Sequence, residues 1–208
     1  MADRTIKVIT PAANIGMVTL DEAKTLLGIT LSTPESDEQL QFLIDINSAT
    51  IMRYCNRIFA KEKVQESWRD IGGRRVFLSH WPVAEADIES VYSGDTLLDP
   101  TGYELEEASG KVSNFNGWIE PVVITYTGGY ELPAECPLPL KQATALLIRE
   151  AKFMATLVTA AGMRSISHKE KRVQFFDPNK MLGSSAGSVT PMHAAVNSLL
   201  VHYTRWEV

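Results

Sequence analysis

The sequence predicts an α+β fold: a helical core of two long helices plus shorter helices, a small antiparallel β lobe inserted between helices, and an extended C-terminal arm. Three observations support this prediction. Apolar residues recur at about 3.6-residue spacing within 36–56, and the first half of 138–160 is apolar nearly all round, which is typical of a helix buried on most sides. Between these stretches, short β-rich runs are separated by turn residues about every 8–12 positions. After Gly162 the apolar pattern gives way to Ser, Lys and Gly.

The chain is expected to divide into an N-terminal arm over 1–18, a main domain over 19–163 with its β insertion at about 62–130, and a C-terminal arm with a terminal helix over 164–208. The N-terminal arm shows neither helical nor strand periodicity.

A first, short helix is predicted to begin after Thr19. Thr19 and Glu22 have the spacing of a capping box, in which the hydroxyl accepts from a free backbone N–H and the carboxylate reaches back to the cap. Gly28 ends this helix after about two turns.

The same capping spacing recurs at Ser36 and Gln39, where a second helix starts that runs to about Asn56. Its apolar stripe comprises Leu40, Leu43, Ile44, Ile51, Tyr54, Cys55 and Ile58. Short strands are predicted at 75–78, around Ile88 and Val91, at 103–105 and at 122–127.

A long helix is predicted over about 138–160, after three prolines that disfavour a strand. A last helix has Thr190 as its N-cap and Pro191 at its first position, and ends near Tyr203. The two longest helices are expected to pack together, with these side chains buried: Leu43, Ile44, Ile51, Leu147 and Ile148.

The net charge of −5 is unevenly distributed. Residues 1–60 carry 5 basic and 7 acidic side chains, 61–130 carry 6 and 12, and 131–208 carry 9 and 6. A protein that grips duplex DNA normally has a basic face, so this distribution disfavours tight duplex binding. With two cysteines, no signal-peptide pattern and no stretch long enough to span a bilayer, we expect a soluble protein made in a reducing cytoplasm.

No pattern of residues points to catalysis, a cofactor or a metal site. The four histidines have no zinc-site spacing and are expected to be ordinary surface or boundary residues. Cys136 precedes a helix N-terminus, where a thiolate is favoured, but without a family signature a small buried apolar role is preferred. The acidic side chains of the middle region, including Glu106 and Glu107, form either a solvated face or the acidic wall of a channel.

The segment 169–176 mixes basic and aromatic residues, which leaves three interpretations open. It could stack on single-stranded nucleic acid, order on a protein partner, or be a plain surface loop. The partner interpretation is preferred because the rest of the chain has no continuous basic surface to which DNA could bind.

The order of several short phrases resembles the head–tail connector (adaptor) proteins of long-tailed double-stranded DNA phages. The phrases lie at 18–24, 37–57, 78–83 with Ile88 and Val91, 124–130 and 140–143, with a looser echo at 196–200. The resemblance covers 18 to about 155, and the arm 164–189 contains no matching phrase.

This resemblance implies a non-enzymatic virion component of the neck, at the head–tail interface. It implies a ring, usually dodecameric, that lies beneath the portal, extends the DNA channel without binding DNA specifically, and gives stopper or tail-completion proteins a docking surface. An acidic lumen would repel DNA and let it slide.

The C-terminal segment of such adaptors commonly reaches the portal, and the basic and apolar residues there are candidates for that contact. They are Arg164, Lys169, Lys171, Arg172, Phe175, Phe176, Met181, Leu182, Met192, Val196, Leu199, Leu200 and Tyr203. Three alternatives remain: a neighbouring tail-completion or stopper protein, a small cytosolic enzyme using Cys136 or the middle carboxylates, and a single-stranded nucleic-acid binder using 164–180.

Overall fold

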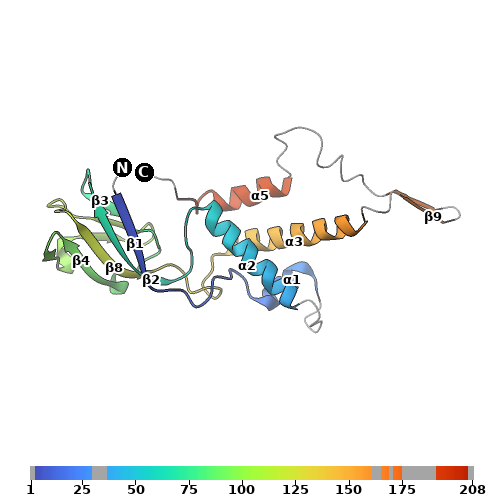
Figure 1. The fold of residues 1–208 in the computed structure, drawn as a ribbon, viewed down its shortest axis with the longest axis horizontal. Helices are drawn as coiled ribbons and strands as arrows, with labels where there is room; N and C mark the ends of the chain where they lie inside the picture. The colour runs from blue at the N-terminus through green and yellow to red at the C-terminus, as the bar shows by residue number, and fades with distance from the viewer. Residues whose placement is uncertain (1–2, 30–36, 161–164, 169–170, 175–190, 206–208) are drawn as a thin grey trace.

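The computed structural model describes residues 3–29, 37–160, 165–168, 171–174 and 191–205 and has an α+β architecture. A β lobe lies at one end and a helical part follows it along the long axis of the molecule (Figure 1). The N-terminal strand belongs to the β lobe, whereas the C-terminal helix packs in the helical part.

Two antiparallel sheets form the β lobe. The five-stranded sheet has the order β1 (Asp3–Thr10), β2 (Glu62–Arg69), β8 (Val122–Gly128), β4 (Ile88–Ser93), β5 (Thr96–Leu97). The second sheet has the order β3 (Arg75–Phe77), β7 (Lys111–Ser113), β6 (Glu104–Glu106), and the short 3-10 helices η2 (Glu85–Asp87) and η3 (Pro100–Gly102) lie in the connections.

Alternation along the strands builds the core of this lobe. On β2, Val64, Glu66 and Trp68 point inward while their neighbours are more exposed, and on β8 Ile124 and Tyr126 do the same. The other buried members of this cluster are Val76, Leu78, Val83, Val91, Val112 and Val122.

The N-terminal segment differs from the arm without periodicity that the sequence predicts. Asp3–Thr10 forms β1, which pairs antiparallel with β2 from Asp3 opposite Arg69 to Val8 opposite Val64. Most of β1 is exposed although the strand pairs with β2, so burial imposes little hydrophobic alternation on its sequence. The β lobe therefore combines a segment before the first helix with the strands from β2 to β8.

The helical part contains α1 (Leu20–Leu27), α2 (Asp37–Tyr54), α3 (Leu138–Ala160) and α5 (Pro191–Leu200) among the described residues. The start and end predicted for α1 are confirmed: Thr19 and Glu22 form the capping box, and Gly28 adopts a left-handed conformation with φ of 68°. The predicted bounds of α3 are also confirmed. Ser36 and Thr190, the predicted caps of α2 and α5, lie outside the described residues.

Four helices share the core of this part, rather than the two longest alone. Ile51 of α2, Leu140 and Ala143 of α3, and Val196 and Leu200 of α5 are buried in one cluster. A second cluster joins α1, α2 and α3 through Ala23, Leu40, Ile44 and Ile148. Leu43 and Leu147, which the sequence predicts to be buried, are only half-buried because they lie at the margins of these clusters.

Two ion pairs also tie α1 to its neighbours. Lys24 Nζ lies 2.6 Å from Asp37 Oδ1 of α2, and Lys141 Nζ of α3 lies 2.5 Å from Glu22 Oε1.

Beyond α3, the structure shows regular pairing where the sequence pattern predicts none. Strand β9 (Ser165–His168) pairs antiparallel with β10 (Lys171–Gln174), with Lys171 opposite His168. The candidate residues Lys171 and Arg172 therefore lie on a strand of a hairpin rather than in an irregular arm.

Candidate assembly surfaces

The junction between the β lobe and the helices is closely packed. Ala60, which follows α2, forms a parallel bridge with Tyr130, which follows β8. A Cβ atom at Gly128 would lie 2.3 Å from the backbone oxygen of His80, and one at Gly129 would lie 2.4 Å from the backbone oxygen of Ala60. These glycines let three backbone segments approach each other, which fixes the two parts of the molecule against one another.

A buried arginine holds this junction from the helical side. The Arg57 guanidinium lies 3.5 Å from the centroid of the Trp81 ring and 4.8 Å from that of Phe59, and it donates to the backbone oxygen of Trp81. Burial lowers its pKa to about 10, so it stays charged at neutral pH. Stacking on aromatic faces is the interaction that makes burial of a guanidinium tolerable.

A polar network crosses the β lobe next to this arginine. The buried Glu66 carboxylate accepts from the Ser79 backbone N–H at 2.8 Å and from the hydroxyls of Ser79 and Tyr126. Burial, together with the Glu66 charge, raises the pKa of Tyr126 far above its usual range, so the phenol stays protonated and donates.

His80 belongs to the same network, which contradicts the surface or boundary position predicted from the sequence. Its side chain is buried, with Nδ1 2.8 Å from Ser79 Oγ and Nε2 3.2 Å from Glu62 Oε2. Burial lowers the pKa of His80, although the carboxylates of Glu66 and Glu62 oppose that shift. Ser79, His80 and Glu66 are buried and hydrogen-bonded in one connected network inside the β lobe.

Both cysteines are buried, as the structural interpretation of each predicts. Burial raises the pKa of the Cys136 thiol to about 12 and that of Cys55 to about 11. Both side chains are therefore protonated, and neither has the thiolate character that a cysteine nucleophile requires.

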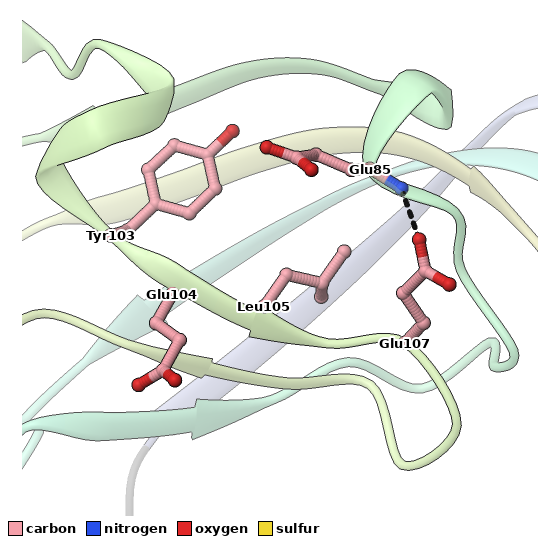
Figure 2. A pocket seen from close by; sticks show the side chains of 5 residues that line it. All are labelled: Glu85, Tyr103, Glu104, Leu105 and Glu107. Atoms are coloured by element: carbon pink, nitrogen blue, oxygen red, sulfur yellow. Dashed lines mark hydrogen bonds between the residues drawn. The ribbon is translucent and has the colours of Figure 1, made fainter.

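The acidic middle region surrounds a shallow pocket on the β lobe. Figure 2 shows Glu85, Tyr103, Glu104, Leu105 and Glu107 around it, with the Glu107 carboxylate 3.0 Å from the Glu85 backbone nitrogen that donates to it. Partial burial, followed by the charges of Glu85 and of Asp99, raises the pKa of Tyr103. Three glutamates at one opening make this surface repulsive to phosphate.

Neither a metal site nor a membrane span is found in the described part of the chain. There, no three histidine, cysteine or acidic side chains are grouped so that they could hold a metal ion. None of the described helices has the length and apolar character needed to cross a bilayer.

The structure separates the candidate portal-binding residues into three groups. Val196 and Leu200 are buried inside the chain, and the half-buried Tyr203 ring packs edge-on against Phe59 at 6.1 Å between centroids. Leu199 is also half-buried against this core, and the Arg205 backbone N–H donates to Cys55 O at 2.8 Å. Met192 lies in the first turn of α5.

The remaining candidates belong to the segment 164–182. Lys171 and Arg172 are in β10. The others are outside the described residues: Arg164, Lys169, Phe175, Phe176, Met181 and Leu182. Val196, Leu199 and Leu200 of α5, which were candidates for a partner, thus already pack within the chain.

One exposed apolar surface was missed by the sequence analysis. Phe42 of α2 is 64 % exposed and Ile46 is 45 % exposed. Both lie one helical turn apart on the side of α2 opposite Ile44 and Ile51. The signal was present in the sequence as a second apolar spacing on the same helix, but periodicity alone does not say which of two stripes faces the core.

The fold is that of subunits from the necks of phage-like particles. A chain from the neck of an empty GTA particle, computed with C6 symmetry, matches with a TM-score of 0.59 and 15 % identity, covering 98 % of this chain and 97 % of that chain. A chain from the virion of the native gene transfer agent (GTA) matches with a TM-score of 0.57 and 15 % identity, and one from the neck of a native GTA particle, computed with C12 symmetry, with 0.55 and 14 %. Each of these two matches covers 98 % of this chain and 97 % of the GTA chain.

Residues 16–170 match the sequence model of the family described as head completion protein. The chain therefore belongs to the head completion protein family, and the resemblance to phage head–tail connector proteins is confirmed. No curated protein matches the sequence significantly.

Proposed function

We propose that the protein is a structural, non-enzymatic subunit of the virion neck, made in the host cytoplasm and assembled at the head–tail interface. It forms a ring, dodecameric in the simplest case, that lies beneath the portal, extends the DNA channel and gives a stopper or tail-completion protein its docking surface. The observation that carries this proposal is the match of fold over nearly the whole length of neck chains from GTA particles, together with membership of the head completion protein family.

The charge distribution supports a channel that DNA passes without specific binding. The β lobe carries the acidic pocket of Glu85, Glu104 and Glu107, which repels phosphate. We place this face of the lobe toward the lumen, where repulsion lets the duplex slide.

The portal contact is assigned to the C-terminal third. Within it, the hairpin keeps this role, whereas the buried residues of α5 do not. Lys171 and Arg172 on the β9–β10 hairpin remain candidates for an acidic portal surface, and so do the basic and apolar candidates outside the described residues. Val196 and Leu200 instead hold α5 on the subunit, because their side chains are buried there. Helix α5 thus holds the C-terminal third on the subunit, and the β9–β10 hairpin contacts the portal.

Particles made without this protein and particles carrying an epitope inserted between β9 and β10 test the proposal. We expect filled heads that lose DNA and lack tails in the absence of the protein, and cryo-electron microscopy of tagged particles should place the label next to the portal. A label next to the tail tube would favour the stopper or tail-completion role, and normal tailed particles without the protein would refute a neck function.

A further inference from the structure

Helix α2 presents an apolar stripe to solvent along the side that faces away from its own core. Phe42 and Ile46 form its apolar part, with the exposed Ala49 and Arg53 continuing it along the helix. The stripe spans about 16 Å at about 1.5 Å per residue. Helices with apolar residues on two opposite sides are usually buried on both sides. We therefore expect the outer side of α2 to be covered by a partner.

Helix α3 carries a second outward stripe. Leu138 is 79 % exposed and Phe153 is 55 % exposed, and the exposed Gln142 and Arg149 lie between them on the same side. The opposite side of α3 is buried through Leu140, Ala143, Thr144 and Ile148. Because the buried sides of α2 and α3 contribute to the same core clusters, their outer stripes lie on opposite sides of the helix pair.

We propose that the outer stripe of α2 in one copy of the chain packs against the outer stripe of α3 in the next copy, and that this contact builds the ring. The inference rests on the ring proposed above and adds the two surfaces that form it. Two different stripes on opposite sides of one subunit make a head-to-tail contact, which repeats from copy to copy instead of ending at a dimer and forms a ring when the rotation between copies closes.

The N-terminal half of the α2 stripe carries a charge opposite to that of the α3 stripe, whereas Arg53 lies at the far end of the α2 stripe. Glu38 and Asp45 flank the α2 stripe on its N-terminal half, whereas Arg149 lies within the α3 stripe. In the proposed contact Arg149 of one copy can lie against Glu38 and Asp45 of the next, and the exposed apolar side chains supply the buried area. A contact between two α2 stripes would instead bring Glu38 and Asp45 of both copies together.

Complementation between two variants tests the head-to-tail arrangement. Phe42→Asp damages only the α2 surface and Phe153→Asp only the α3 surface, and Phe115→Asp, at a site on the β lobe that is 67 % exposed, is the matched control. Sedimentation velocity over a concentration series measures self-association, and circular dichroism with thermal unfolding checks that each variant folds.

We expect wild type and F115D to form rings, and F42D and F153D each to stay monomeric. An equal mixture of F42D and F153D should form dimers and nothing larger, because only one intact α2 surface and one intact α3 surface remain per pair. In particles made with F42D, the neck should lack the ring.

Other outcomes would overturn the contact. Dimers of F153D alone would show a symmetric α2 contact, and rings of F42D or F153D would show that the stripe serves another neck protein or no partner. If the wild-type chain forms no ring in solution or in particles, the proposed ring fails and this contact fails with it. Rings of wild type with intact association of both variants refute the contact alone.

Discussion

Shortening Leu200 to alanine tests whether the C-terminal helix belongs to the subunit core. Leu200 is 2 % exposed and packs in the cluster that contains Cys55, Phe59 and Leu140. Removing three buried carbon atoms costs about 2.4 kcal/mol in transfer free energy, at about 0.8 kcal/mol per methylene. The remaining cavity adds to this cost, and measured Leu-to-Ala losses lie at about 2–5 kcal/mol.

We expect the free energy of unfolding to fall by about 3 kcal/mol, which corresponds to a Tm lower by about 6–12 °C for a chain of this size. Urea unfolding followed by tryptophan fluorescence and thermal unfolding by circular dichroism measure the two quantities. Val201→Ala, at the neighbouring and 48 % exposed position, is the control and should change stability by less than about 0.5 kcal/mol.

An L200A protein with unchanged unfolding free energy that no longer joins heads would refute this reasoning. It would show that Leu200 is released from the core to contact the portal, as the sequence alone suggested. Loss of both stability and head joining, with joining restored at low temperature, would support the core role.

Three further predictions concern the junction and the buried network. Tyr126→Phe removes the hydroxyl that donates to Glu66 and accepts from the His80 backbone N–H. The free energy of unfolding, measured by urea titration, should fall by about 2–4 kcal/mol. An unchanged value would mean that the network is not formed. Gly128→Ala places a Cβ against backbone, so its Tm should fall sharply, whereas Gly72→Ala, with open space around it, should leave the Tm near wild type. Because burial lowers the pKa of His80, the unfolded chain binds the extra proton first, so stability should drop as pH falls below about 6.5. Replacing His80 by Gln should flatten that part of the pH profile, and an equal slope in H80Q would assign it to other groups.

The local elements could be predicted from the sequence because their signals are local. Thr19, Glu22 and Gly28 define α1 through hydrogen bonds and a backbone conformation that involve near neighbours only. The bounds of α3 follow from prolines before it and a continuous apolar pattern within it. The acidic charge of the middle region was also predicted from composition. The pocket that brings Glu85 and Glu107 together was visible only in the fold.

The strand β2 was not predicted because its sequence signal is mixed. In β2, the inward position of Glu66 interrupts the apolar alternation, and only the donors from Ser79 and Tyr126, distant in sequence, make that burial tolerable. His80 is likewise held by residues distant in sequence, since its backbone N–H donates to the Tyr126 hydroxyl and its Nε2 lies 3.2 Å from Glu62 Oε2, so no local pattern could have revealed its burial.

The sequence by itself determined the α+β class, the capping and bounds of α1, the bounds of α3, the acidic β lobe and the membership of a neck-protein family, because each is encoded in neighbouring residues, composition or ordered phrases. Only the tertiary structure decided that β1 completes the sheet of the β lobe, that Val196 and Leu200 bury α5 in the core, and that Phe42 faces outward. The reason is physical: an apolar side chain carries the same transfer free energy whether it packs on its own chain or on a partner, and only the three-dimensional arrangement decides which surface it covers.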